Sequence, residues 1–256
     1  MRIGFAGAGN MAAAIARGWA AAGAEGPTAM LFCDLDAGRA DALAAEVGGE
    51  TRSSLPELRD DSDVLLLAVK PGALDAVAAE LDGEAPPLVS VLALTPLDRL
   101  EAAFRGIPVL RVMPNQPVEV RRGVICHPPA RGMEARLETQ LLALLDLLGE
   151  RVELPEAQID AAMAVMSCSP AYVALFAEAL AAGGAREGLD EAVALPLAVA
   201  AVGGTAELLR RRDPAMVRST VASPGGATEA GLQALDRGGF GAALEAAVTA
   251  SLERFR

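Results

Sequence analysis

The stretch that decides the fold lies near the start of the chain and reads Ile3-Gly4-Phe5-Ala6-Gly7-Ala8-Gly9-Asn10-Met11-Ala12. Its first four residues form a short apolar run, which predicts a buried strand, and a helical pattern follows from Met11 to Ala22. The glycines between them fit G-x-G-x-x-G/A, which permits a tight turn and a close approach of a pyrophosphate to the backbone. Because a helix start offers free N–H groups to phosphate, we expect Gly7, Ala8, Gly9, Asn10 and Met11 to bind a dinucleotide. An ordinary glycine turn is the alternative.

Short apolar runs and helical patterns alternate through the first half of the chain. Strands are expected at 3–6, 30–33, 64–69, 88–92 and 109–113, and helices at 11–22, 37–47 and 73–81. This alternation predicts a parallel sheet with helices on both faces. With the glycine turn, it indicates an α/β fold with a Rossmann-type doubly wound sheet.

From about residue 155 the pattern changes to helices alone. They are expected at 157–182, 191–212, 228–235 and 240–254, with another starting at Asp213-Pro214 and a kink or break at Pro196. We therefore predict a dinucleotide-binding domain over residues 1–153 and an all-helical domain over residues 154–256. The first two helices are apolar almost all round and need to be buried. A partner subunit would bury them, so we expect at least a dimer; packing against the first domain is the alternative.

Composition argues against several classes of function. The net charge is -12 and no basic stripe is visible, which argues against nucleic acid. The three cysteines form no C-x-x-C pair and His127 is the only histidine, so neither a metal site nor a Ser-His-Asp triad is expected. Glycines interrupt the apolar N-terminus, which argues against a signal peptide. No run approaches the roughly 18 uncharged apolar residues of a membrane span, so we expect a soluble, cytoplasmic protein.

Two charged residues follow predicted strands at the sheet edge where ligands bind. Asp34 ends the second strand, where an acidic side chain hydrogen-bonds the adenine ribose 2′-OH and so favours NADH. Arg39 could still accommodate NADPH, and Asp34 could instead cap the next helix. Lys70 is the only lysine among 22 cationic side chains. An ammonium is a compact point charge that arginine does not replace where space is tight, so we expect Lys70 in the site; chance survival is the alternative.

Four segments together resemble the pyrroline-5-carboxylate reductase family. They are Gly7-Ala8-Gly9-Asn10-Met11, Ala68-Val69-Lys70-Pro71, Arg111-Val112-Met113-Pro114-Asn115-Gln116-Pro117, and Val221-Ala222-Ser223-Pro224-Gly225-Gly226-Ala227-Thr228-Glu229-Ala230-Gly231-Leu232. A fifth segment, Pro170-Ala171-Tyr172, precedes a long helix. The order and spacing match over nearly the whole chain, and the third and fourth segments are specific to this family.

The resemblance implies a Rossmann domain followed by a helical dimerisation domain, in homodimers that can assemble into rings. It implies NADPH- or NADH-dependent reduction of the cyclic imine 1-pyrroline-5-carboxylate to L-proline, in proline biosynthesis. Ala68, Val69, Lys70, Pro71, Met113 and Asn115 would then border the cofactor, with Lys70 also catalytic.

The turn at 223–228 would hold the substrate carboxylate, because helix N-termini bind anions. The residues assigned to the substrate are Ser223, Gly225, Gly226, Ala227 and Thr228, and the resemblance puts Thr228 beside the ring nitrogen as a catalytic residue. A simple interhelical turn is the alternative. The activity requires this turn and the glycine turn at residues 7–11 to face a common cleft.

Departures from the family pattern lie near the site. Ser167-Cys168-Ser169 replaces the usual Gly-Ser-Gly, Leu94 and Gln116 replace Gly and Thr, and Ala227 replaces the first Thr after Gly-Gly. Leu94 is expected to crowd the nicotinamide pocket. These changes leave open a non-catalytic paralogue that binds NAD(P), or a reductase of another cyclic imine. A 3-hydroxyacid dehydrogenase is disfavoured, because that class resembles this design but has a catalytic lysine in the helical domain.

Overall fold

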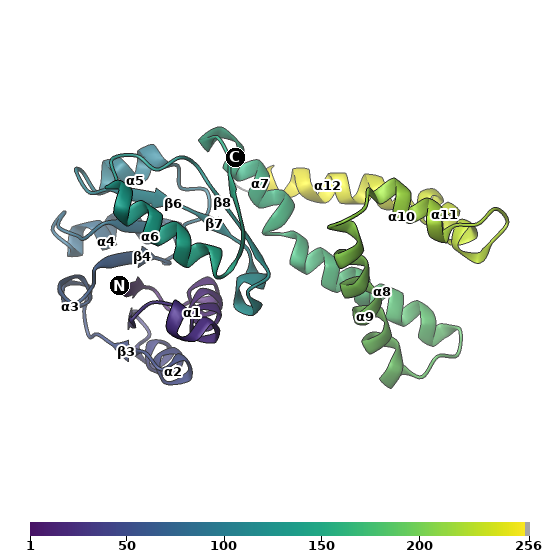
Figure 1. Ribbon diagram of the computed structural model, residues 1–256, viewed down its shortest axis with the longest axis horizontal. Helices are drawn as coiled ribbons and strands as arrows, with labels where there is room; N and C mark the ends of the chain where they lie inside the picture. Colours follow the sequence, from purple (N-terminus) through teal and green to yellow (C-terminus); the bar gives the residue numbers. More distant parts are fainter. Residues whose placement is uncertain (254–256) are drawn as a thin grey trace. The chain divides into compact units, whose positions relative to one another are not determined.

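The computed structural model describes residues 1–253 (Figure 1). The chain divides into two compact units, Met1–Ser167 and Cys168–Arg256. The boundary expected after residue 153 coincides with the end of strand β9 (Gly149–Glu153). Residues 154–167 nevertheless belong to the first compact unit, so the domain limits drawn from the sequence stay a prediction.

The first unit is built on a six-stranded parallel sheet with the order β3-β2-β1-β4-β5-β6, which is the Rossmann order. The strands are β1 (Arg2–Ala6), β2 (Ala29–Cys33), β3 (Glu50–Thr51), β4 (Val64–Leu67), β5 (Leu88–Ser90) and β6 (Val109–Arg111). Ala6 pairs with Cys33 on one side and with Leu67 on the other. The three central strands therefore end level with one another, and the predicted fold class is confirmed.

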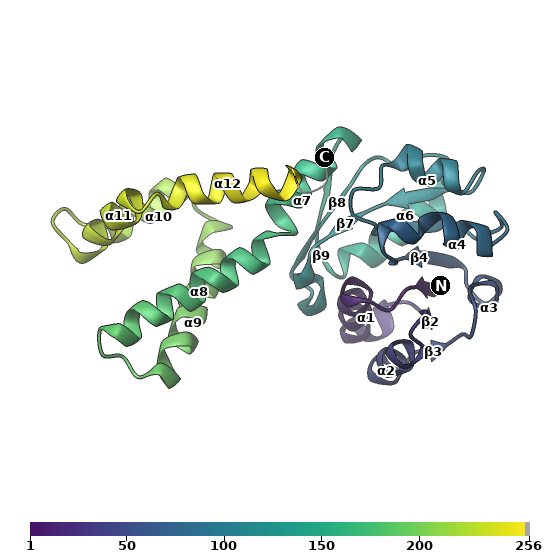
Figure 2. The ribbon, with the colours of Figure 1, turned by 180° about the vertical axis from the view of Figure 1, so that it is seen from behind.

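Helices cover both faces of this sheet. Two separate clusters of buried apolar side chains lie between sheet and helices, because each strand alternates its side chains between the faces. One face packs against α1 (Asn10–Ala22), α2 (Ala37–Val47) and α6 (Ala135–Asp146), and the other against α3 (Leu55–Asp60), α4 (Leu74–Glu80) and α5 (Leu97–Ala103). Figure 2 brings α4 and α5 to the front. Short 3-10 turns η1 (Gly23–Glu25), η2 (Pro71–Ala73), η3 (Gln116–Val120) and η4 (Glu156–Gln158) connect the elements.

A second, three-stranded sheet extends the first unit. Strands β7 (Met113–Pro114) and β8 (Gly123–His127) are antiparallel, and β9 runs parallel to β8. The sequence predicts one strand at 109–113, whereas the structure ends β6 at Arg111 and starts β7 in the other sheet. His127 is buried, with Nδ1 2.9 Å from the Pro128 carbonyl oxygen and Nε2 3.2 Å from Arg151 Nη1. The single histidine therefore serves to hold this sheet.

The second unit is helical throughout its described residues. After α7 (Ile159–Met166), which ends the first unit, it contains α8 (Ser169–Arg186), α9 (Glu191–Leu209), α10 (Pro214–Val221), α11 (Ala227–Arg237) and α12 (Phe240–Glu253). Asp213 caps α10 by accepting a hydrogen bond from the Ala215 N–H at 2.7 Å, as its sequence predicts. Pro196 lies inside α9 without breaking it. The Tyr172 hydroxyl lies 2.7 Å from Ser251 Oγ and links α8 to α12.

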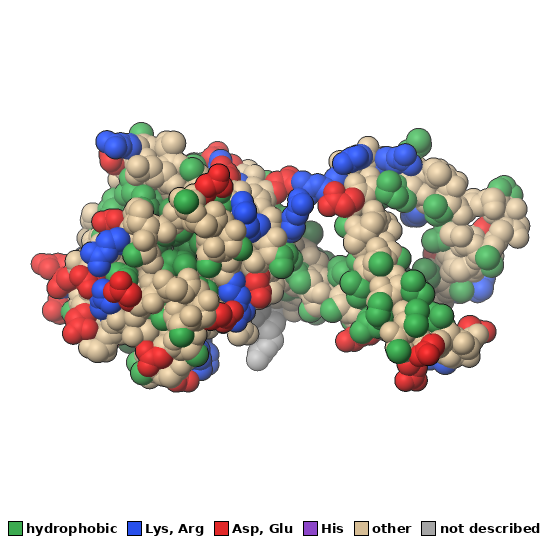
Figure 3. Space-filling model, turned by 60° about the horizontal axis from the view of Figure 1, so that its bottom comes forward, with side chains coloured by type: hydrophobic (Ala, Val, Ile, Leu, Met, Phe, Trp, Pro, Cys, Tyr) green, Lys and Arg blue, Asp and Glu red, His purple; other side chains and the backbone are tan. Residues whose placement is uncertain are grey.

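Large apolar side chains lie exposed on this helical unit (Figure 3). On α8 and α9 they are Val173, Leu175, Phe176, Leu180, Val193, Leu195, Leu197, Val199, Leu208 and Leu209. Two stretches, Glu156–Arg186 and Glu191–Leu209, are long and apolar enough to cross a membrane by length and composition alone. The sequence analysis expects no stretch of this length and composition, and these two helices correct that expectation. In the first of them, Glu178 is the only charged residue between 169 and 185.

A buried arginine fastens α7 to the parallel sheet. Arg111, at the end of β6, is 1% exposed and pairs with Glu156 at 2.5 Å and with Asp160 at 2.9 Å. Glu156 also accepts the N–H of Leu97 at 2.9 Å. Arg111 is the buried member of this network, whereas Glu156 and Asp160 are 26% and 43% exposed. Truncating the arginine removes both ion pairs and the volume of a large buried side chain, which is destabilising.

We expect Arg111→Ala to lower the free energy of unfolding of the first unit by about 3 kcal/mol, because it leaves two carboxylates without their cation. Urea unfolding followed by the fluorescence of Trp19, the only tryptophan and a buried one, measures this change. Arg99→Ala is the matched control, since its pair with Asp75 is exposed and such pairs contribute less than about 1 kcal/mol. Equal losses in the two variants would contradict the structural role of Arg111.

Candidate functional site

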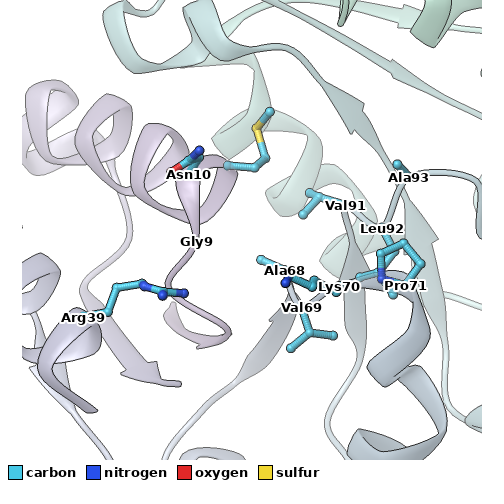
Figure 4. Close-up of a pocket in the computed structure, with 11 residues that line it drawn as sticks. Gly9, Asn10, Arg39, Ala68, Val69, Lys70, Pro71, Val91, Leu92 and Ala93 are labelled. Carbon is cyan, nitrogen blue, oxygen red and sulfur yellow. The ribbon is translucent and has the colours of Figure 1, made fainter. Parts of the chain in front are cut away.

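A pocket of about 600 Å³ lies at the carboxyl ends of the central strands. Figure 4 shows its lining residues, which come from the loop after β1 and the start of α1, from α2, and from the segments that follow β4 and β5. They are Gly9, Asn10, Met11, Arg39, Ala68, Val69, Lys70, Pro71, Val91, Leu92 and Ala93. Seven of them were assigned to the cofactor from the sequence. Ligands bind at this edge in open parallel sheets, where neighbouring connections diverge.

Gly7 sets the shape of the loop. Its backbone has φ +100°, and its N–H donates a hydrogen bond to the Cys33 carbonyl at 2.8 Å. A Cβ atom at this position would lie 2.8 Å from the carbonyl oxygen of Ala68. Both the backbone angle and the close approach of the β4 segment therefore require glycine here.

Gly9 is a glycine for a different reason. It is the N-cap of α1, with no side chain closing the helix end, and an added Cβ would meet no protein atom within 4 Å. The protein itself leaves that space open, so packing does not explain the absent side chain. The first-turn N–H groups of a helix have no intrahelical partner and favour an anion. These features fit the pyrophosphate of a dinucleotide.

Asp34 connects two loops at the end of β2. Its Oδ2 accepts the N–H of Ala8 at 2.7 Å, and its Oδ1 accepts the N–H of Asp36 at 2.9 Å. The cap of α2 is Asp36, whose side chain accepts the N–H of Arg39. Asp34 is therefore not the cap of that helix. Burial raises the pKa of the neighbouring Cys33 thiol, and nearby carboxylates add to the effect, so this cysteine behaves as an apolar residue.

Lys70 lies in the pocket wall, in the segment that follows β4. The predicted strand ran to residue 69, but β4 ends at Leu67, so Ala68 and Val69 separate it from Lys70. Its side chain is exposed and makes no hydrogen bond or ion pair within residues 1–253. An unpaired ammonium at this edge is available to a ligand. In the same described part of the chain, no group of three or more His, Cys, Asp or Glu side chains could hold a metal ion.

Five residues assigned to the cofactor are absent from this pocket lining: Gly7, Ala8 and Asp34, in the loops described above, and Met113 and Asn115. Met113 is buried in a cluster with Cys126, Ile159 and Met163. The Asn115 side chain donates to the Met166 carbonyl at 3.0 Å and accepts the N–H of Val124 at 2.8 Å. Asn115 thus ties β8 to the end of α7, and the cofactor roles of both residues stay predictions.

Leu94 takes a left-handed backbone conformation, which favours glycine, the residue usual here in the family. Its φ is +54°, and its side chain packs against the buried Met113 cluster. Ala93 lines the pocket, whereas Leu94 is absent from its lining. The Leu94 side chain therefore packs against the protein interior and does not line the pocket.

The turn at 223–228 leads into the start of α11, which no side chain caps. Gly225 has φ +72°, and Gly226 is the N-cap of α11 with no side-chain cap. The Gly225 N–H donates to Glu229 at 2.7 Å, while the N–H groups of the first turn of α11, which include those of Ala227 and Thr228, have no intrahelical acceptor. Thr228 is exposed, as is Ser223.

The sequence missed three residues of the pocket, Val91, Leu92 and Ala93. Val91 and Leu92 were assigned to the strand at 88–92, but β5 ends at Ser90 and all three lie in the following loop. The rule that ligands contact the carboxyl ends of parallel strands would have identified them.

Two family models match the chain. One, described as "NADP oxidoreductase coenzyme F420-dependent", matches residues 2–94, and the other, "Pyrroline-5-carboxylate reductase dimerisation", matches residues 156–256. The Rossmann sheet with its open glycine loop and the helical unit therefore define an oxidoreductase of the nicotinamide-dinucleotide class with a dimerisation domain.

Full-length relatives narrow the class. A pyrroline-5-carboxylate reductase of Synechocystis sp. is 37% identical over 258 residues, with 99% of this chain and 97% of the relative covered. Pyrroline-5-carboxylate reductase 3 of Macaca fascicularis is 37% identical over 270 residues, with coverages of 100% and 95%. The chain belongs to the pyrroline-5-carboxylate reductase family, as the sequence motifs predict.

Solved structures agree with this assignment. The 1-pyrroline-5-carboxylate reductase of Streptococcus pyogenes has a TM-score of 0.90 and 28% identity, with 100% of this chain and 98% of that chain covered. The Plasmodium falciparum pyrroline carboxylate reductase with NADP bound has a TM-score of 0.85 and 25% identity, with coverages of 100% and 97%.

Gly9→Ala tests whether the open space at Gly9 belongs to a ligand. We expect the free energy of unfolding to change by no more than about 1 kcal/mol, because the backbone is unstrained and the space is free of protein atoms. The affinity for NADH, measured by titration calorimetry, should fall at least about tenfold, because the methyl group occupies the space of the pyrophosphate.

Gly7→Ala is the contrasting variant. It should destabilise the first unit by about 2 kcal/mol, because it combines a positive φ with a clash against Ala68. Unchanged NADH binding in Gly9→Ala would place the dinucleotide elsewhere.

Proposed function

We propose that this protein reduces 1-pyrroline-5-carboxylate to L-proline with NADPH or NADH, the last step of proline biosynthesis. The observation that carries the proposal is that one chain combines an open dinucleotide pocket with the Ser223–Thr228 turn. Over 99% of its length this chain is 37% identical to a pyrroline-5-carboxylate reductase of Synechocystis sp.. Family membership favours catalysis over a binding-only paralogue.

The first unit supplies the cofactor half of the site. Gly9 leaves room for the pyrophosphate at the start of α1, and the Ala68-Val69-Lys70-Pro71 segment borders the opposite side of the pocket. The reduced nicotinamide supplies the hydride that adds to the carbon of the substrate's C=N bond. Lys70 adds a positive charge beside the phosphates or the substrate carboxylate, and no carboxylate of the described residues 1–253 pairs with it.

The second unit supplies the substrate half. The free N–H groups at the start of α11 can hold the single carboxylate of the substrate. The Thr228 hydroxyl is exposed at the same helix start and is assigned to the ring nitrogen. Hydride transfer requires this turn, from the same chain or from a second copy, to meet the nicotinamide end of the pocket.

No strong general acid is needed for this chemistry. If the imine arrives protonated, hydride addition alone yields the neutral secondary amine, and positioning with charge stabilisation does the rest. The one histidine fits this view, because it is buried and both ring nitrogens face protein partners.

The assembly we propose is a homodimer formed through the helical units and located in the cytoplasm. Several such dimers could then assemble into a ring. The apolar side chains exposed on α8 and α9 support the dimer, because a second copy would remove them from water. The match of this part of the chain to a dimerisation domain supports it as well.

Thr228→Ala should lower the turnover number with pyrroline-5-carboxylate by about tenfold to a hundredfold, the effect of one or two hydrogen bonds at about 1.4 kcal/mol per decade. The loss of reduced-nicotinamide absorbance measures the rate. Ser219→Ala is a matched control on the neighbouring helix α10, since that hydroxyl donates to the Met216 carbonyl. A rate unchanged in Thr228→Ala would remove this hydroxyl from the site, and cofactor binding without turnover in the unaltered protein would favour the paralogue.

Leu175→Asp should shift the dimer toward monomer, because a carboxylate would be placed on an apolar face that is 65% exposed in the single chain. Size-exclusion chromatography with light scattering gives the mass. Val120→Asp, at a side chain that is 67% exposed in the first unit, is the control. A Leu175→Asp protein that remains fully dimeric would contradict the proposed interface.

A further inference from the structure

The end of α7, where the chain passes from the first unit into the second, is held by a side chain from elsewhere in the first unit. Helix α7 ends at Met166 and α8 starts at Ser169. In a continuous helix the Met166 carbonyl would accept the N–H of residue 170. Residue 170 is proline, which has no N–H to donate. Asn115 Nδ2 donates to the same carbonyl at 3.0 Å.

The hydrogen bonds of Asn115 allow only one orientation of its amide. Its Oδ1 accepts the Val124 N–H at 2.8 Å, whereas its Nδ2 faces the Met166 carbonyl, which can only accept. The backbone N–H of Asn115 also donates to the Val124 carbonyl at 3.2 Å. The residue is only 7% exposed, so little water competes for these bonds. Asn115 therefore fixes the end of α7 against β8.

A second contact joins the same two segments. Ser167 Oγ lies 3.2 Å from the Pro114 carbonyl oxygen, to which it can donate, and 3.2 Å from Met166 Sδ. Pro114 is the last residue of β7 and directly precedes Asn115. Two adjacent residues thus contact the last two residues of the first unit, Met166 and Ser167.

The segment that contains Asn115 starts at the sheet edge where the dinucleotide pocket lies. Strand β6 ends at Arg111, and residues 112–115 lead from its carboxyl end into η3. Because β6 is parallel to β5, that end lies at the same edge as the loop after β5, which lines the pocket. Asn115 is itself absent from the lining. It therefore connects the cofactor-binding sheet to the point from which the helical unit continues.

We propose that Asn115 is a positioning residue for hydride transfer and does not contact the cofactor. By holding the end of α7, it fixes the point from which the chain continues toward the substrate turn. Misplacement of reacting groups by about 1 Å can lower a rate about a hundredfold. The dinucleotide pocket is formed by the first unit alone, so cofactor affinity should not depend on this contact. The inference rests on the proposed function in taking the cyclic imine as the substrate.

Asn115→Asp removes the donor and preserves the shape of the side chain. At about pH 8, where a carboxylate is ionised, it can still accept the Val124 N–H but presents an acceptor to the Met166 carbonyl. The turnover number with saturating imine and NADH should fall about tenfold or more. The NADH dissociation constant, measured by titration calorimetry, should stay within about twofold. An increase in that constant as large as the fall in rate would overturn the proposal and place Asn115 in the cofactor site.

Gln158→Glu is the matched control. It makes the same change from amide to carboxylate at an exposed position, the N-cap of α7, and it should leave the turnover number and the NADH dissociation constant unchanged. Trp19 fluorescence in urea checks that each variant is folded.

A single turnover in the stopped-flow instrument separates misplacement from a loss of folded enzyme. With enzyme in excess over NADH, the amplitude reports the fraction of active protein and the rate constant reports hydride transfer. In Asn115→Asp the rate constant should fall about tenfold or more with the amplitude retained. A lower amplitude with an unchanged rate constant would overturn the proposal, because the residue would then only stabilise the fold.

Hydrogen exchange followed by mass spectrometry tests the contact without a substrate. In Asn115→Asp, exchange in peptides covering residues 163–171 should rise about fivefold or more, because the helix end opens more often. Gln158→Glu should show no such rise. Ser167→Ala removes only the second contact and should give a smaller rise and a smaller fall in rate, so it provides the test if Asn115→Asp does not fold.

The two kinds of failure are distinguishable. Unchanged exchange at residues 163–171 in Asn115→Asp and in Ser167→Ala would overturn the positioning role, whatever the substrate is. An unaltered protein that binds NADH and does not reduce the imine would contradict the proposed function.

Discussion

The close approach of the β1 turn to the end of β4 is the constraint on which the site depends. Gly7 lies with its Cα against the carbonyl of Ala68, in a conformation that other residues rarely adopt. The register that ends β1, β2 and β4 level with one another produces this contact. Once the strand ends meet, Gly9 of the glycine loop, Arg39 and Lys70 border one pocket although they are far apart in the sequence.

The same edge shows how one charged residue can hold two loops together. Asp34 ties the glycine loop to the β2 loop through two backbone hydrogen bonds, which its negative charge strengthens. Asn115 joins two segments without a charge, since its amide is engaged by Met166 and Val124 and lies outside the pocket lining.

The helical unit has a different constraint, which is the need to cover its apolar surface. Helices α8 and α9 contact each other along their length, yet their leucines and valines remain exposed in the single chain. By composition these helices would suit a membrane as well as a protein interface. The match to a dimerisation domain favours the interface, and the polar turn before α11 then becomes part of an assembled enzyme.

The sequence by itself determined five strands of the parallel sheet, the change to an all-helical second half, the glycine loop and the family, because periodicity and turn residues are local signals. It did not indicate the two-residue strand β3 or the helices α3, α5 and α6. It also indicated Asp34 and Lys70, since each follows a predicted strand directly. The tertiary structure alone decided that Asp36 caps α2, that Met113 and Asn115 belong to the packing around β8, and that Leu94 turns toward that cluster. It also decided the second sheet, whose short, partly polar strands gain their pairing from partners distant in the chain. Such choices depend on which groups meet in space, and no local pattern encodes that.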